Sequence, residues 1–180
     1  MNVILLWNVY FLWTAFISFL PVNNTNPKKM EIHSTAFRNG ETIPSIYTCD
    51  GKDISPQIAW SNIPPGTKSL ALICDDPDAP GGTWVHWVIF NIPSSLNGLS
   101  ENMPRTPMLP NDIIQSKNSW GRTGYGGPCP PRGVHRYYFK LYALDISLKI
   151  DSNSLIKDVS GAMKDHILGK AELMGRYSRK

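Results

Sequence analysis

Two stretches of this chain, about forty residues apart, carry the side chains best suited to binding a small ligand. In each stretch a turn rich in Pro and Gly leads to a histidine at the start of an apolar strand. The first stretch runs from Asp75 to Trp87 and the second from Gly126 to Tyr137. Because such turns restrict the direction of the backbone, we expect the two stretches to form two walls of one pocket.

The first turn places three carboxylates within four residues, at Asp75, Asp76 and Asp78. Repulsion between them, together with partial burial, predicts a raised pKa for at least one of the three unless a donor lies nearby. One of them can instead stabilise the turn by accepting hydrogen bonds from its own backbone. That leaves Asp76, and after it Asp78, as the candidates for ligand binding.

His86 and His135 are the candidate donors to an anion, because an imidazole at a strand entrance can be half protonated near neutral pH. A structural role is the alternative for either ring. The run from Gly126 to Pro128 would let a ligand come close to main-chain N–H groups, which can bind phosphate or carboxylate. Four aromatic residues could form the apolar floor of the pocket or belong to the core: Trp84, Trp87, Tyr125 and Tyr137.

Three other kinds of site find less support. Two His, two Asp and Cys129 could hold zinc, but the chain has neither histidines at helical ligand spacing nor a CxxC pair. The spacing of Gly121, Gly124 and Gly127 is similar to that of a dinucleotide loop, yet no βαβ unit surrounds it. No Ser or Cys lies in a nucleophile elbow. We therefore expect no metal, no cofactor and no catalytic residue, with hydrolysis of a small ester as the enzymatic alternative.

The elements that must position these residues are mostly strands. With 15 Pro and 14 Gly among 180 residues, and 42% hydrophobic and 18% charged residues, the chain is typical of one globular domain rich in turns. Apolar runs predict strands over 69–74, 86–92, 137–144 and 171–177, after strand-like pieces between 32 and 47. The first of these runs is apolar on both faces and should lie centrally in its sheet.

One helix is predicted over residues 156–168, where apolar residues recur at helical intervals. Asp158 and Ser160 are available as caps, and Gly169 as a C-terminal stop. The polar, irregular stretch over 97–125 is long for a connection, and such segments are usually functional or mobile. We expect it to cover the pocket.

The formal net charge of +4 falls to +2 without Lys28 and Lys29, because 16 basic and 14 acidic side chains remain. No basic stripe interleaved with aromatic residues is present, only a short Arg176–Lys180 tail, which we interpret as solvated. The sequence therefore argues against a nucleic-acid partner.

The three cysteines show no metal-binding spacing. Cys74 lies in an apolar run and is predicted to be a buried small hydrophobe. Cys49 and Cys129 both lie in turns, so one disulfide between them could form if the protein is exported.

Residues 1–29 are interpreted as a hydrophobic N-terminal segment and linker, and residues 30–180 as the globular domain. Residues 3–20 are long enough for a signal-peptide core or a marginal membrane span, but no Lys or Arg precedes them and no small-x-small cleavage site follows. The protein would be exported or membrane-anchored if this segment is used, with membrane contact only through residues 3–20. It would be cytoplasmic if Met30 is the true start.

These motifs together resemble the phosphatidylethanolamine-binding protein family, in its bacterial and archaeal Raf-kinase-inhibitor-like branch. The resemblance covers roughly Glu31 to the C-terminus. Besides the two pocket stretches, it includes five short segments in the same order and spacing: Tyr47–Gly51, Ile54–Pro56, Gly66–Ser69, Tyr142–Asp145 and Ala171–Leu173.

The resemblance implies a mostly β domain with a large central antiparallel sheet, a smaller sheet packed against it, and one or two peripheral helices. It also implies an anion pocket for phosphate-like head groups, and a cis peptide bond at Ala79–Pro80. Carried over by position, the family's ligand-binding residues are Asp76, Pro80, Trp84, His86, Gly127, Pro128, His135 and Tyr137, with Asp78 alongside. Two departures concern selectivity: Val85 stands where eukaryotic members have a histidine, and Cys129 where they have a proline.

The leading hypothesis is a non-enzymatic binding protein for a small anionic ligand, either a phosphate or a phosphorylated head group, with a regulatory role. Its pocket would hold the anion between His86, His135 and backbone amides, and binding should strengthen as the pH falls through the histidine range. The alternative is a protein-interaction module that inhibits a kinase or hydrolase through the pocket rim.

Overall fold

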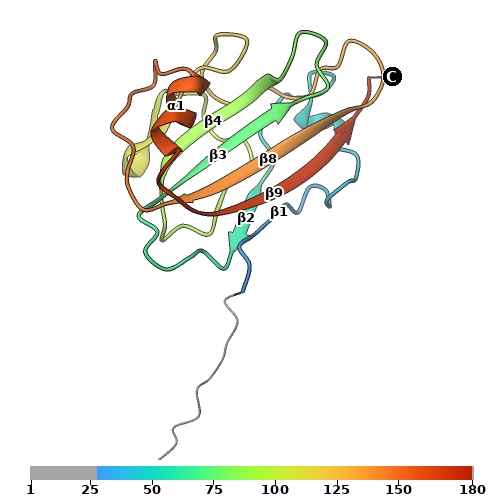
Figure 1. Ribbon diagram of the computed structural model, residues 1–180. Coiled ribbons are helices and arrows are strands. Elements are labelled where there is room, and N and C mark those ends of the chain that lie inside the picture. The colour runs from blue at the N-terminus through green and yellow to red at the C-terminus, as the bar shows by residue number, and fades with distance from the viewer. Residues whose placement is uncertain (1–27, 180) are drawn as a thin grey trace, which may run out of the picture.

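The computed structural model describes residues 28–179 as two antiparallel β-sheets, one α-helix and two short 3₁₀ helices (Figure 1). The smaller sheet has the strand order β1-β2-β5 and the larger one β6-β7-β4-β3-β8-β9. The strands are β1 (Glu31–His33), β2 (Ile58–Ser61), β3 (Ser69–Asp76), β4 (Trp84–Pro93), β5 (Gly98–Leu99), β6 (Met108–Leu109), β7 (Ile113–Gln115), β8 (His135–Leu144) and β9 (Ile167–Tyr177). The helices are α1 (Ile156–Met163) and the 3₁₀ turns Ser45–Tyr47 and Pro110–Asp112.

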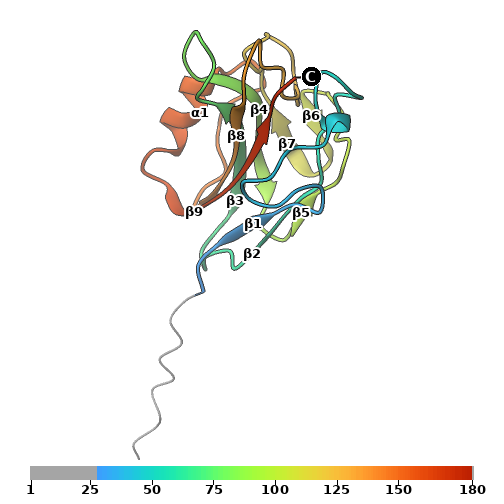
Figure 2. The ribbon, with the colours of Figure 1, turned by 90° about the vertical axis from the view of Figure 1, so that its right-hand side faces the viewer.

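The large sheet forms the middle layer of the molecule. The small sheet covers one face, and α1 lies on the other (Figures 1 and 2). The core between the sheets includes Trp60 and Leu99 from the small sheet and Leu72, Trp87 and Phe139 from the large one. A second cluster joins the opposite face of the large sheet to Val159 and Met163 of α1. Both faces of the central strands are therefore removed from water.

The central strand is β3, as its sequence predicts, because all eight of its residues are buried and it pairs with β4 on one side and β8 on the other. The strands predicted over 86–92 and 137–144 are confirmed within β4 and β8. In β8, Tyr137 and Phe139 face the core between the sheets, while Tyr142 packs against the cluster on the helix side. The mostly β fold, with its two sheets and peripheral helix, agrees with the prediction.

The predicted helix over 156–168 is too long, since α1 ends at Met163 and Ile167 already belongs to β9. His166 ends the turn because its Nδ1 bonds an oxygen of Asp145 at 2.8 Å and its carbonyl accepts the Asp145 N–H at 3.1 Å. Gly169 is consequently a residue of β9, where a Cβ would lie 2.8 Å from Pro64, and is not a helix stop. Asp158 does act at the helix start, since its carboxylate accepts the N–H of Leu155 at 2.8 Å. The strand predicted over 171–177 is confirmed and begins earlier, at Ile167.

Two irregular regions differ in detail from expectation. Of the strand-like pieces between residues 32 and 47, only β1 is a strand, and Ser45–Tyr47 forms a 3₁₀ turn after Pro44. The stretch 97–125 is mostly irregular but contributes β5, β6 and β7 to the edges of the two sheets. The Lys28–Arg179 part of the chain contains no helix long and apolar enough to cross a membrane. The interpretation of residues 1–29 as a signal or anchor concerns residues that lie almost entirely outside the described range.

Replacing Gly161 by alanine in α1 is expected to stabilise the protein. Gly161 lies inside the helix, its φ is not positive, and a Cβ there would meet no atom within 4 Å. Alanine reduces the freedom of the unfolded chain, so the free energy of unfolding should rise by about 0.5–1 kcal/mol. Urea unfolding followed by circular dichroism measures the change. Gly133→Ala is the control that should not stabilise, because Gly133 has equal space around it but a φ of +70°. A loss of stability in Gly161→Ala would contradict the expectation.

Candidate functional site

A cavity of about 280 Å³ lies where the two sequence stretches meet. We call it the binding cavity. Its lining includes both histidines and an Asp, and all of it except Trp120 comes from the two stretches: Asp76, Ala79, Pro80, Gly81, Trp84, His86, Trp120, Cys129, Pro130, Pro131 and His135. Residues of the two distant turns therefore line one cavity.

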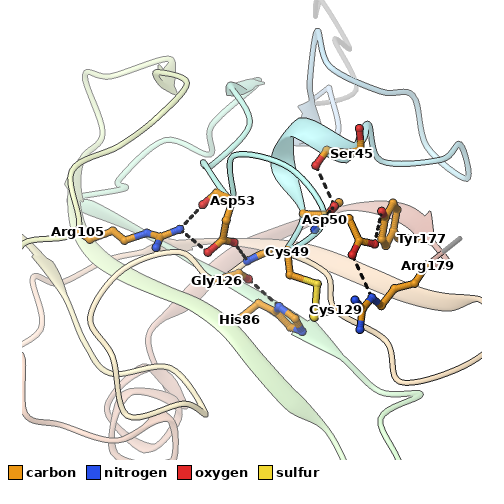
Figure 3. Close-up of a disulfide and its surroundings, with 12 residues drawn as sticks. Ser45, Cys49, Asp50, Asp53, His86, Arg105, Gly126, Cys129, Tyr177 and Arg179 are labelled. Atoms are coloured by element: carbon orange, nitrogen blue, oxygen red, sulfur yellow. Dashed lines mark hydrogen bonds and ion pairs between the residues drawn. A yellow bond between two sulfur atoms is a disulfide. The ribbon is translucent and has the colours of Figure 1, made fainter.

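His86 lies on the wall made by β4, with its side chain almost wholly buried. Its Nδ1 lies 2.7 Å from the carbonyl oxygen of Gly126 (Figure 3). Because a carbonyl oxygen can only accept, Nδ1 carries the proton, and Nε2 is the ring's remaining nitrogen. Burial lowers the pKa of His86, and the Gly126 carbonyl offsets this only in part. The free protein therefore holds this ring neutral near pH 7, with a lone pair on Nε2.

His135 begins β8 and is held by Asp76 at the end of β3, with 2.7 Å between Nδ1 and Oδ2. Both side chains are at least nine-tenths buried. The other carboxylate oxygen of Asp76 accepts the N–H of Asp78 at 2.8 Å. Asp76 thus stabilises its own turn and orients an imidazole at the same time, which the sequence presented as alternative roles for the three aspartates. The free ring nitrogen of His135, like that of His86, is Nε2.

Aromatic rings pack around the histidines. Trp120 meets the His86 ring edge-on at 4.9 Å between centroids and the Trp84 ring at 5.4 Å. On its other side His86 meets Tyr137 at 5.1 Å. The indole N–H of Trp84 is buried and finds no acceptor among the described residues. Since an indole nitrogen can only donate, this buried N–H is an unsatisfied donor.

Trp120 is a residue that sequence reasoning missed. It lies in the irregular stretch 97–125, which was expected to cover the pocket, and it is the one residue of that stretch in the cavity lining. Its neighbour Ser119 joins this segment to β4, because the Ser119 hydroxyl accepts the Val85 N–H at 2.8 Å and the Ser119 N–H donates to the Val85 carbonyl at 2.9 Å.

Four predicted site residues do not line the binding cavity: Asp78, Gly127, Pro128 and Tyr137. Asp78 is paired with Arg136, whose Nε and Nη2 lie 2.8 and 2.6 Å from its two oxygens. The Arg136 guanidinium lowers the pKa of Asp78 to about 2. The Tyr137 ring packs edge-on against the His86 ring and is fully buried. Its hydroxyl has no hydrogen-bond partner within residues 28–179.

The expected role of Gly127 as a backbone donor to ligand is wrong in this structure, because its N–H donates to Oδ1 of Asp53 at 2.6 Å. Asp53 in turn binds Arg105, with 2.8 Å between Oδ2 and Nη2 (Figure 3). A Cβ at Gly127 would lie 2.8 Å from both that carboxylate and the Cα of Thr48. Glycine is therefore required here for close packing of two loops. Pro128 accepts the Cys49 N–H at 3.1 Å and has the same structural role.

A disulfide between Cys49 and Cys129 fixes the second wall (Figure 3). The bridge was one alternative left open by the sequence, and the third cysteine, Cys74, is buried in β3 as predicted. Cys129 lines the cavity, so the bridge attaches the cavity wall to the loop that follows the 3₁₀ turn Ser45–Tyr47. That loop is held further by Asp50, which accepts from Tyr177 at 2.8 Å.

The cis peptide bond expected at Ala79–Pro80 is not found, because the described residues contain no cis bond. The Gly82 N–H donates to the Ala79 carbonyl at 3.1 Å, which makes Pro80 the second residue of a four-residue turn. Proline at that position favours turns with a trans bond, whereas a cis proline occupies the third position.

Asp75 is the carboxylate of the first turn with a raised pKa, and burial, not repulsion among the three aspartates, is the main cause. Burial raises the pKa of Asp75, although its Oδ2 lies 2.6 Å from Nζ of Lys140, which acts in the opposite direction. Asp75 is not among the residues that line the binding cavity. In residues 28–179 no three His, Cys, Asp or Glu side chains are grouped so that they could hold a metal ion.

Residues 33–178 match the sequence model of a family described as phosphatidylethanolamine-binding protein. The chain belongs to this family. Among its relatives, a UPF0098 protein of Methanothermobacter thermautotrophicus is 53% identical over 150 residues, which cover 83% of this chain and 99% of the relative.

Two solved structures of the family share the fold. A putative phosphatidylethanolamine-binding protein homologue from Chlamydia trachomatis is 38% identical, with a TM-score of 0.78 over 84% of this chain and 99% of that one. An Escherichia coli protein, described as a new member of the mammalian family, is 34% identical, with a TM-score of 0.79 over 85% and 100%. The resemblance seen in the sequence and the fold it implied are thereby confirmed.

Proposed function

We propose that the protein is a non-enzymatic binding protein whose cavity takes a phosphoryl group, free or carried by a small head group. The observation that carries the proposal is a pair of imidazoles that line one cavity and whose Nδ1 atoms are already engaged, which leaves Nε2 of His86 and Nε2 of His135 for a ligand. A phosphoryl group carries several oxygens in a small volume, so it can pair with both nitrogens once a proton lies between ring and oxygen. The aromatic rings beside these atoms exclude water and so strengthen each hydrogen bond.

Binding rather than turnover is favoured because the cavity contains no nucleophile paired with a base. Cys129 is oxidised in the disulfide, and the carboxylate of Asp76 is already engaged by His135 and by the backbone. The family description and the names of the relatives carry no enzymatic activity.

Binding should take up a proton. The neutral His86 ring presents a lone pair on Nε2, which a fully ionised phosphoryl oxygen would repel. A proton is therefore needed between them, either on the ring or on the phosphoryl group, whose second pKa is about 6. Since burial lowers the pKa of His86, affinity should strengthen as the pH falls below 7.

Calorimetric titration with phosphate and with phosphoethanolamine, at pH 7.5 and 6.0, tests the proposal. We expect tighter binding at the lower pH and a heat that changes between buffers of different ionisation enthalpy, as proton uptake requires. His86→Ala and His135→Ala should each weaken binding at least about tenfold, the loss of one charge-assisted hydrogen bond. Trp84→Phe should weaken it less, since it removes part of an apolar wall and no charge-assisted hydrogen bond.

His166→Ala is the matched control, because His166 also bonds an aspartate, Asp145, but is nearly half exposed and outside the binding cavity. It should bind like the wild type. Absence of binding at both pH values, or equal affinity in the His86 and His135 variants, overturns the proposal. A protein partner retained by those variants would instead favour the interaction module.

A further inference from the structure

A second depression adjoins the binding cavity and shares His135 with it. It is more open, encloses about 610 Å³, and is lined by residues of the 131–136 turn, the start of β8 and the end of β9. We call it the arginine depression. The residues that line it are Asp78, Arg132, Gly133, Val134, His135, Arg136 and Arg176. None of the three arginines was a candidate site residue, and Arg176, expected in a solvated tail, lies in β9.

The arginine depression carries an excess of positive charge. Three guanidinium groups face one carboxylate, Asp78, which three hydrogen bonds tie to Arg136: from the backbone N–H at 2.9 Å and from Nε and Nη2 at 2.8 and 2.6 Å. Arg132 and Arg176 form no ion pair with any residue of the described chain. Two permanent charges are therefore left without a counterion.

The sheet itself brings like charges together. Arg136 of β8 and Arg176 of β9 are direct partners in the antiparallel register. Like charges in that arrangement repel one another and destabilise the pair. The Arg176 backbone is fixed beside the 41–43 segment, since its N–H donates to the Glu41 carbonyl at 2.8 Å and its carbonyl accepts the Ile43 N–H at 2.8 Å. Asp78 neutralises only one of the two charges, so an added anion would relieve the remaining repulsion.

We propose that the arginine depression binds a second anionic group of the same ligand. A ligand whose terminal phosphoryl group occupies the binding cavity would pass beside His135 and place a phosphate or carboxylate between Arg132 and Arg176. The ligand class is thus a small molecule with two anionic groups. This extension rests on the proposed function, since it takes the cavity as the site of the first group.

The test compares propyl phosphate with propane-1,3-diyl bisphosphate by calorimetry on the full chain at pH 6.0. We expect the bisphosphate to bind about tenfold more tightly, with a steeper loss of affinity at higher salt. In the double variant Arg132→Gln/Arg176→Gln that preference should fall to less than about twofold, while the propyl phosphate affinity stays as in the wild type. The replaced side chains are exposed, so the fold should persist, as a thermal melt would show.

Lys149→Gln/Lys157→Gln is the matched control, because it removes the same charge from exposed positions outside the depression. It should keep the bisphosphate preference. Equal affinity of the wild type for both compounds overturns the second subsite and leaves the proposed function standing. Failure of propyl phosphate to bind at all overturns the proposed function, and this extension with it. A preference that survives in the arginine variant also overturns the extension.

Discussion

Replacing both Cys49 and Cys129 by serine is expected to lower the free energy of unfolding by about 2–5 kcal/mol. The bridge joins residues 80 positions apart, so it removes much of the freedom of the unfolded chain. Chemical denaturation under oxidising conditions measures the loss. Phosphate affinity should fall as well, because Cys129 is part of the cavity wall.

The wild type supplies its own control. Dithiothreitol should lower its stability to that of the double serine variant and leave the variant unchanged. Cys74 is buried and remains a thiol in both proteins, so it does not contribute to the difference. Three titratable thiols in the unreduced, denatured wild type would show that the bridge does not form, and would contradict the prediction.

Replacing Lys140 by methionine is expected to cost about 3 kcal/mol, because it leaves the Asp75 carboxylate buried without a counter-charge. The other oxygen of Asp75 already has no hydrogen-bond partner among the described residues. Urea unfolding at pH 7 measures the loss. Lys170→Met, in the neighbouring exposed pair with Glu172, is the control and should cost less than about 1 kcal/mol.

The stability loss caused by Lys140→Met is expected to be larger at neutral pH than at acidic pH. Burial raises the pKa of Asp75 in the folded protein, so the folded state binds this proton more tightly than the unfolded state. The penalty for burying the charge is therefore present above the folded pKa and is relieved as the pH falls through it. Removing Lys140 raises that pKa further, and the loss of stability should shrink on acidification. Asp75→Asn combined with Lys140→Met should recover part of the loss at pH 7. A loss in the single variant that is independent of pH would contradict this account.

Much of the fold can be predicted because buried strands have a local signature. The apolar run of β3 indicates burial on both faces, and the alternation in β8 indicates which of its faces is buried more deeply. The end of α1 has no such signature, because Ile167 continues the helical spacing of Val159 and Met163. The contact between His166 and Asp145 ends the helix, and its partner lies 21 residues away.

In the candidate site, too, some residues could be predicted from the sequence and others could not. Asp76, Trp84, His86 and His135 could be identified because each adjoins a turn that constrains it, and Pro80 from the family resemblance. All five line the cavity. The availability of the Gly127 N–H could not be judged, since its acceptor Asp53 lies 74 residues away. Trp120 could not be selected from an irregular stretch without periodicity. Long-range pairing decides which groups remain free for a ligand.

The position of Cys129 on the cavity wall makes the chemistry of the site depend on its surroundings in the cell. Where thiols are kept oxidised, the ligand meets an inert sulfur held in place by its partner. Where glutathione keeps thiols reduced, the same position presents a nucleophilic sulfhydryl beside two imidazoles, open to alkylation or to a mixed disulfide. The same chain would then bind ligands with two different cavity walls, one with the disulfide and one with the free thiol. Affinities measured on air-oxidised protein would describe only the disulfide form.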